Sequence, residues 1–279
     1  NLWNQVSNTI VGATADDKIS RKIAFNETGN IIITGSPFNN NDTGYVKVYQ
    51  YNETNNLWEQ LGSTIFGDAA GDLMSNGVDI NGIGDIIAVS AVFNDGPSGN
   101  VINNRGQTKI FQLINNDWVQ LGDDILGATD SEGSGADISL NKAGNRIAIG
   151  ANFFDNGGSI TSDFGTVRIY DYNGTSWVQV GGNISSNNFS SNDGFAVDLN
   201  DVGDLVAIGG RLNDDNGTNS GHAFVYKYNG SAWVLHGQEI KGESTGDEFG
   251  WQVSFNNTGS RLAVGSRLND GGGTNSGHA

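Results

Sequence analysis

The sequence contains no cysteine and only 2 prolines among its 279 residues. Without cysteine the chain can form no disulfide, no thiolate metal site and no cysteine nucleophile. It has no run of about 18 apolar residues, so we expect no helix that spans a membrane and no direct membrane insertion. No charged segment followed by an apolar one, as in a signal peptide, stands at its start.

Basic residues are also scarce. The chain has 14 Lys and Arg against 31 Asp and Glu, which gives a formal net charge of −17. Phosphate binding needs clustered Lys and Arg, so nucleic acid is not expected as a partner. A soluble surface or a cation-binding face fits this charge better. What the chain does have is 42 glycines and regular short apolar runs, which indicate a folded rather than a disordered protein.

An Asn-x-x-Gly turn recurs five times, each time 23 residues after a tryptophan. The pairs are Trp3 and Asn26, Trp58 and Asn81, Trp118 and Asn141, Trp177 and Asn200, and Trp233 and Asn256. The steps between successive tryptophans range from 55 to 60 residues, so the length variation lies outside this frame. Repeats of this length usually build propellers or solenoids.

The third repeat predicts four strands. Residues 118–125 and 136–140 alternate apolar and polar side chains, as half-buried strands do. A tight turn at 141–144 leads into 145–150, whose continuous apolar character is typical of a strand buried on both faces. After a polar loop, residues 165–172 form another strand.

Four strands joined by short turns make a β-meander, and repeated meanders around an axis are the blades of a β-propeller. The sequence therefore predicts an all-β propeller of four-stranded antiparallel blades. We expect one domain over residues 1–279, with repeats starting near residues 3, 58, 118, 177 and 233. A stacked solenoid is the alternative, but solenoid repeats are usually shorter.

The strand pattern ends within a repeat. An outer strand is expected at residues 2–10, followed by five pairs of first and second strands but only four third strands. Gly277 begins a segment that matches the start of the third strand at Gly221. We therefore expect a fragment of a larger ring of six or seven blades, with a five-bladed ring as the alternative.

These residues resemble the FG-GAP repeat, the blade unit of integrin α-subunit propellers and of many bacterial surface proteins. Phe249-Gly250 matches the Phe-Gly element, and Gly35-Ser36-Pro37 comes closest to the Gly-Ala-Pro element. Residues 233–279 look even more like a variant found in secreted and surface proteins. The resemblance implies a propeller in an extracellular or cell-surface protein. The calcium loop of integrin-like blades is not implied here, because the short Asn-x-x-Gly turn lacks its carboxylates.

One face of the predicted propeller is the candidate binding surface. The loop that enters the first strand and the loop between the second and third strands share this face, which we call the loop face. The second of these loops varies most in length between repeats, and variable loops on a rigid scaffold commonly carry binding sites. The opposite face, which carries the Asn-x-x-Gly turns, is the turn face.

Two acidic positions repeat on the loop face, nine residues before and fourteen residues after the turn asparagine. The first set is Asp17, Asp72, Glu132 and Asp247, with Ser191 in the fourth repeat. The second set is Asp95, Asp155, Asp214 and Asp270, with Asn40 in the first repeat. Each pair could coordinate Ca²⁺ together with loop carbonyls. The alternative is that these side chains cap turns by accepting hydrogen bonds from backbone N–H groups.

The aromatic and histidine residues give weaker signals. The fixed place of the repeat tryptophans favours packing between blades over sugar stacking. Trp251 lies instead on a first strand, where its ring could line the axis or close the interface between blades. His222 and His278 occupy one repeat position, which favours a structural role. No Ser/His/Asp set recurs, so no catalytic residue is assigned, and Ca²⁺ is the only cofactor considered.

Three functions fit these features. The first is a non-catalytic extracellular binding or adhesion module whose loop face meets protein or glycan partners. The second is a carbohydrate-active enzyme, a glycosidase or lyase, which would need two or three carboxylates near the axis with perturbed pKa values. The third is a structural spacer within a large surface protein.

Overall fold

The computed structural model describes residues 4–15, 17–96, 103–155, 163–185 and 191–279. The first sheet consists of β1 (Ile23–Phe25), β2 (Ile31–Ser36), β3 (Tyr45–Asn52), β4 (Leu57–Gln60) and β5 (Ile65–Phe66), and α1 (Asn39–Asp42) is a short turn between β2 and β3. The second consists of β6 (Met74–Ile80), β7 (Ile86–Ala91), β8 (Gln107–Ile114), β9 (Asp117–Gln120) and β10 (Ile125–Leu126).

The third sheet consists of β11 (Ser134–Leu140), β12 (Arg146–Ala151), β13 (Thr166–Tyr172) and β14 (Trp177–Gln179). The fourth consists of β15 (Asp193–Leu199), β16 (Leu205–Gly210), β17 (His222–Tyr228), β18 (Trp233–Leu235) and β19 (Ile240–Lys241). The fifth contains β20 (Phe249–Phe255) and β21 (Leu262–Ser266), and His278 forms a bridge to Ser266.

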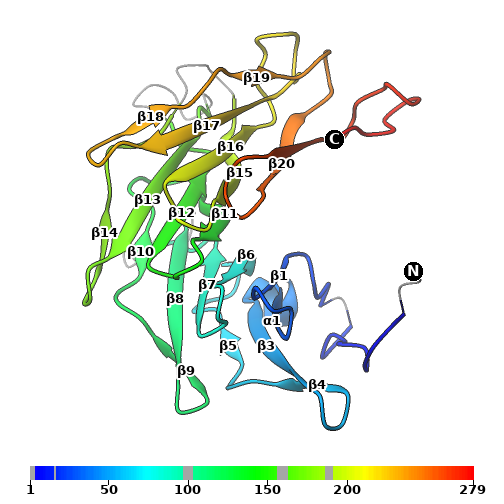
Figure 1. Ribbon diagram of the computed structural model, residues 1–279, viewed down its shortest axis with the longest axis vertical. Coiled ribbons are helices and arrows are strands. Elements are labelled where there is room, and N and C mark those ends of the chain that lie inside the picture. The colour runs from blue at the N-terminus through cyan, green and yellow to red at the C-terminus, as the bar shows by residue number, and fades with distance from the viewer. Residues whose placement is uncertain (1–3, 16, 97–102, 156–162, 186–190) are drawn as a thin grey trace.

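The sheets follow one another around a common centre (Figure 1). The first strand of each sheet packs against the first strand of the next, in the order β1, β6, β11, β15 and β20. All strand pairs within the sheets are antiparallel, which confirms the predicted all-β propeller architecture. The predicted third strands β3, β8, β13 and β17 each begin directly after the expected glycine.

Each hydrophobic core lies between two neighbouring sheets, and the second strand of a sheet serves two cores. On β7, Ile87 and Val89 join the core shared with the first sheet, whereas Ala88 joins the core shared with the third. Side chains alternate between the two faces of a strand. Second strands are therefore mostly apolar on both faces, because both faces are covered.

The Asn-x-x-Gly turns link the sheets to one another. The side-chain Oδ1 of Asn141 accepts hydrogen bonds from the N–H groups of Asn145 (3.1 Å) and Arg146 (3.0 Å), which fixes the turn. The next residue, Lys142, donates its N–H to the carbonyl of Asp201 in the following turn at 3.1 Å. The corresponding bonds run from Glu27 to Gly82, from Gly82 to Lys142 and from Asp201 to Asn257. The turns thus form a hydrogen-bonded chain around the axis.

Three of the repeat tryptophans pack between sheets, as predicted, whereas the ring of Trp58 contacts Phe25 and Tyr51 of its own sheet. The indole N–H groups of Trp118, Trp177 and Trp233 donate to main-chain carbonyls of the preceding repeat. The acceptors are Leu61, Leu121 and Val180, at 2.8, 2.8 and 3.0 Å respectively. Trp3 lies outside the described residues. The frame of 23 residues therefore joins two inter-sheet contacts, one at the tryptophan and one at the turn.

The structure corrects two strand predictions. Residues 4–10 form no strand, although residues 2–10 were expected to be one. The segment 118–125 is not continuous, because β9 and β10 are separate short strands that pair with different ends of β8. The break follows Gly122, whose φ of 79° bends the chain. On β1, the apolar residues Ile23 and Phe25 are 53% and 50% exposed, because no described sheet covers that side of the strand.

Candidate functional site

The first set of loop-face carboxylates is buried and caps the loops that enter the first strands. Asp17 accepts hydrogen bonds from the N–H groups of Ala13 (2.6 Å) and Thr14 (2.9 Å) and from the amide of Asn39 (2.7 Å). Burial opposes ionisation, but these hydrogen bonds outweigh it and hold the pKa of Asp17 well below its ordinary value. Asp17 therefore carries its charge in a site built from N–H and hydroxyl donors.

The same arrangement recurs in other repeats. Asp72 accepts from the amide of Asn94 and Asp247 from that of Asn269, both at 2.9 Å. Ser191 takes this place in the fourth repeat, where it is the hydroxyl partner of Asn213 at 3.4 Å. These asparagines stand one residue before the second acidic position, a regularity that the sequence reading did not use.

The third repeat replaces the amide with a guanidinium group. Glu132 is fully buried and pairs with Arg168 through two contacts of 2.6 and 3.1 Å. Phe154 stands where other repeats carry the asparagine, and its ring centroid lies 5.2 Å from the Arg168 guanidinium carbon. Phenylalanine cannot donate a hydrogen bond to the carboxylate, so the cation from β13 satisfies it instead.

The second acidic set caps the loops between the second and third strands. Asp95 accepts from the N–H groups of Asn103 and Asn104, at 2.8 and 3.0 Å. Asp155, Asp214 and Asp270 likewise accept backbone N–H groups, from residues 163, 219 and 275 respectively. Both sets therefore make the turn-capping hydrogen bonds that the sequence reading gave as the alternative to metal binding.

Calcium binding at these positions stays a prediction. Among the described residues no group of three or more His, Asp or Glu side chains is arranged to hold a metal ion. Asp72 has the most favourable surroundings for a cation. Its burial, together with the charges of Asp68 and Asp95, raises its pKa despite the hydrogen bond from Asn94. A cation between Asp72 and Asp95 would relieve this repulsion.

First-strand side chains near the axis join neighbouring sheets. Asp79 on β6 accepts a hydrogen bond from the N–H of Leu140 on β11 at 2.6 Å. Asp198 on β15 likewise accepts from the N–H of Phe255 on β20 at 2.6 Å, and Ser139 from that of Leu199 at 3.1 Å. These three acceptors occupy one repeat position, two residues before the turn asparagine. Each one connects its first strand to that of the next sheet.

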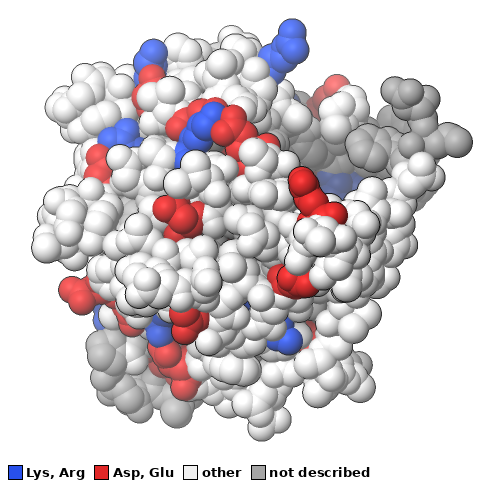
Figure 2. Space-filling view, turned by 60° about the horizontal axis from the view of Figure 1, so that its bottom comes forward, with Lys and Arg blue, Asp and Glu red and all other residues white. Residues whose placement is uncertain are grey.

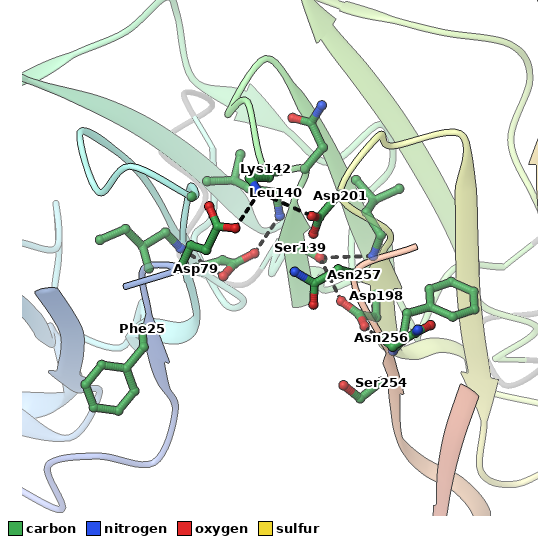
Figure 3. A pocket seen from close by; sticks show the side chains of 16 residues that line it. Phe25, Asp79, Ser139, Leu140, Lys142, Asp198, Asp201, Ser254, Asn256 and Asn257 are labelled. Carbon is green, nitrogen blue, oxygen red and sulfur yellow. Dashed lines mark hydrogen bonds and ion pairs between the residues drawn. The ribbon is translucent and has the colours of Figure 1, made fainter. Parts of the chain in front are cut away.

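A cavity of about 340 Å³ opens on the turn face beside these residues (Figure 3). Figure 3 shows Asp79 and Asp198 on two sides of Ser139. Burial and the charges of neighbouring aspartates raise the pKa of Asp79 to about 7 and that of Asp198 to about 6, although backbone N–H groups oppose the shift. No sequence pattern singles out this pair, because carboxylates are abundant throughout the chain.

A second cavity, of about 390 Å³, lies at the loop-face end of the axis. Its aromatic lining consists of Phe93, Phe153, Phe195 and Trp251, and its polar lining includes Arg21, Lys22, Asn76, Asn152 and Gln252. The prediction that Trp251 could line the axis is confirmed. The sequence reading missed Phe93 and Phe153, although both stand twelve residues after a turn asparagine.

Arginine side chains support the aromatic wall of this loop-face cavity. The rings of Phe195 and Trp251 lie 4.8 Å apart at their centroids. The Arg211 guanidinium carbon lies 4.5 Å from the Phe195 centroid, and that of Arg267 lies 3.8 Å from the Trp251 centroid. Such cation–π contacts hold the rings in place at the mouth of the cavity.

His222 is fully buried and has a structural environment. Its Nε2 lies 2.6 Å from Asp193 and its Nδ1 lies 2.7 Å from Glu239. Burial disfavours the charged imidazole, but the two carboxylates outweigh this and raise the pKa of His222. His222 therefore joins β17 to β15 and to the segment before β19, which agrees with the structural role expected from its repeat position.

Charges of both signs occur together on the face of the molecule drawn in Figure 2. Acidic side chains lie there interspersed with basic ones among uncharged residues. Within the described part of the chain, no helix is long and apolar enough to cross a membrane.

Comparison with known proteins supports the predicted family resemblance. Residues 242–279 match the family model of the FG-GAP repeat, so the last part of the chain is an FG-GAP repeat. This segment contains the Phe249-Gly250 element at the start of β20. No curated protein sequence matches the chain.

Several solved structures have a similar fold. Hydrazine synthase of Kuenenia stuttgartiensis aligns with a TM-score of 0.56 and 12% identity, over 88% of this chain and 61% of that one. TolB of Acinetobacter baumannii aligns with a TM-score of 0.52 and 13% identity, over 91% of this chain and 50% of that one. A candidate 6-phosphogluconolactonase of Bacteroides uniformis aligns with a TM-score of 0.51 and 10% identity, over 89% of this chain and 78% of that one.

At these identities the likeness concerns the fold alone, and it agrees with a β-propeller. The chain spans 61% of the hydrazine synthase chain and half of the TolB chain. The single-domain assignment of residues 1–279 and the total number of blades stay predictions.

Proposed function

We propose that this chain is a non-catalytic extracellular recognition module that binds protein or glycan partners through its loop face. The observation that carries the proposal is the loop-face cavity of about 390 Å³. Phe93 and Phe153 are each 37% exposed beside polar amide and cationic groups. Small-molecule and sugar sites typically combine an apolar wall with a few placed polar groups. FG-GAP repeats are typical of extracellular proteins, which supports the proposed location.

Calcium in the acidic loops is a further part of this proposal. Ca²⁺ would take oxygen ligands from pairs such as Asp72 and Asp95, and it would order the loops around the cavity. Because these carboxylates already accept N–H groups, binding would have to replace some of those hydrogen bonds.

A glycan array and a pull-down from extracellular extract, each run with Ca²⁺ and with chelator, test the proposal. We expect binding that Phe93→Ala weakens, because it removes an exposed wall of the cavity. Phe66→Ala is the matched control, since Phe66 is 59% exposed on β5 and does not line the cavity. Loss of binding or a lower melting temperature in chelator would support the calcium part. No partner in either assay would overturn the proposed function.

A carbohydrate-active enzyme is the second candidate, and Asp79 and Asp198 favour it. Both carboxyls border the turn-face cavity with raised pKa values, as a general acid would require. Each also accepts a main-chain N–H of the next sheet at 2.6 Å, which gives it a structural role. We favour binding because the inter-sheet hydrogen bonds account for both carboxylates. A structural spacer, the third candidate, would leave the loop-face cavity without a role.

A further inference from the structure

The cavities at the two ends of the axis differ in the sign of their charges. A third cavity, along the first strands, shares Arg21 and Lys22 with the loop-face end and Asp79 and Asp198 with the turn-face end. The turn-face cavity is bordered by four carboxylates and one lysine, namely Glu27, Asp79, Asp198, Asp201 and Lys142. Among the described residues, the loop-face cavity is lined by two cations, Arg21 and Lys22, and by no carboxylate. The chain has 31 acidic and 14 basic residues, so a cavity whose charged lining is only basic differs from what the overall composition would lead one to expect.

The positive charge at the loop-face cavity is not fully neutralised by neighbouring carboxylates. Lys22 forms an ion pair with Asp137 at 2.9 Å, and Asp137 does not itself line the cavity. Arg21 is exposed and forms no ion pair with any described residue, and its guanidinium carbon lies 5.9 Å from the Phe38 ring centroid. Its charge is therefore available to a ligand.

The opposite wall also carries an excess of positive charge. Arg211 and Arg267 share a single carboxylate, that of Glu248, at 3.6 and 3.1 Å. The Nε of Arg211 is buried and has no hydrogen-bond partner. Two guanidinium groups with one carboxylate leave a net positive charge beside Trp251.

The uncharged lining has the features of a sugar site. The exposed rings of Phe93 and Phe153 can pack against the apolar C–H face of a pyranose. The amide of Asn76 donates to the Ala136 carbonyl at 2.9 Å, which leaves its Oδ1 to accept from a hydroxyl. Gln252 is exposed at the same cavity and can donate and accept.

We propose that the loop-face cavity binds a carboxylate-bearing sugar, a hexuronate residue of an acidic glycan. This inference rests on the proposed recognition function and narrows its ligand class. Arg21 would bind the carboxylate through charge-assisted hydrogen bonds, for which the planar guanidinium is well shaped. Phe93 and Phe153 would contact the ring, and the amides would bind the hydroxyls.

Isothermal titration calorimetry with trigalacturonate tests the proposal. The neutral comparison is the fully methyl-esterified trisaccharide, which keeps the skeleton but loses the charge, and hexaglutamate represents acidic peptides. We expect trigalacturonate to bind at least about tenfold more tightly than its methyl ester. Arg21→Gln should weaken trigalacturonate binding by about tenfold and bind the ester as wild type does. Arg261→Gln, an equal charge change at an exposed residue beside the turn at Asn256, should change neither.

The outcomes separate this inference from the proposed function. Equal binding of the acid and its ester, or an unchanged affinity in Arg21→Gln, would overturn the acidic-sugar proposal while leaving glycan recognition in place. Binding of hexaglutamate in preference to trigalacturonate would also overturn it and assign the cavity to acidic peptides. No binding of any of the three probes would overturn the acidic-sugar proposal, and the proposed function would then depend on the array and pull-down.

Discussion

At the scale of single residues, side chains near the axis hold neighbouring sheets together. Asp79, Ser139 and Asp198 each accept a main-chain N–H from the next first strand. The corresponding residue of the first sheet is Ala24, whose side chain has no hydrogen-bond acceptor. The N–H of Ile80 on the next first strand therefore donates to the side chain of Asp79 instead, at 2.8 Å. An acceptor at this position is thus one way to join two sheets.

The raised pKa of Asp79 predicts how stability depends on pH. Its pKa is about 7 in the folded protein against 3.8 for the free side chain, so folding favours its protonated form. The contribution of Asp79 to the free energy of unfolding is therefore greatest below about pH 4 and is lost as the pH rises towards 7. We expect Asp79→Asn to be more stable than wild type at pH 8 but not at pH 4.

Urea unfolding at pH 4 and pH 8 measures this effect. Asp79 is partly exposed to the cavity, so solvent reduces the difference to about 1–2 kcal/mol. Asn keeps a side-chain oxygen for the Leu140 N–H. Asp123→Asn, on an exposed loop, is the control for the change in net charge. If the free energy of unfolding of wild type and of Asp79→Asn changed in parallel with pH, the raised pKa of Asp79 would be contradicted.

At the scale of elements, a glycine four residues after four of the five repeat tryptophans explains the split outer strand. Gly62 has a φ of 73°, and a Cβ added to it would lie 2.6 Å from Cδ1 of Trp118. The same contact recurs between Gly122 and Trp177 at 3.0 Å. The glycine therefore bends the strand and makes room for the tryptophan of the next repeat, which packs there.

This close approach predicts a large cost for Gly62→Ala. The methyl group would meet the Trp118 indole, and we expect a loss of about 2–4 kcal/mol from the positive φ and the overpacking together. Gly237→Ala is a matched control, because Gly237 has a φ of 90° but no atom within 4 Å of the added Cβ. It should lose only about 1 kcal/mol, the cost of the backbone conformation. Equal losses in denaturant unfolding would show that the tryptophan contact is unimportant.

At the scale of the whole molecule, each sheet is stabilised by its neighbours. The four described cores lie between adjacent sheets, and the axial and turn hydrogen bonds also connect adjacent sheets. The second, third and fourth sheets have a packed neighbour on both sides. The first and fifth described sheets have one each, and Ile23 and Phe25 are exposed as a result.

This arrangement predicts unequal local stability in the 279-residue chain. Hydrogen exchange followed by mass spectrometry should show the slowest exchange in β7, β12 and β16, and much faster exchange in β1 and β20. The physical reason is that opening an outer sheet breaks one core, whereas opening a central sheet breaks two. Equal protection of β1 and β12 would indicate that the first sheet is covered in solution.

The sequence by itself determined the repeat and the strands within it. Local turn geometry and burial determine several features that could therefore be predicted. These are the paired positions of Trp118 and Asn141, the apolar run of β12, and the glycines before β13 and β17. The split of β9 from β10 could not, because it depends on a tryptophan from another repeat.

Only the tertiary structure decided which side chains meet. The partnership of Asp72 with Asn94, the pairing of Glu132 with Arg168 and the cavity beside Trp251 join residues that are distant in sequence. Abundant carboxylates made Asp79 and Asp198 indistinguishable from the rest until the first strands converged on the axis. Periodicity reports local conformation and burial, whereas a binding site depends on the angles at which separate sheets pack.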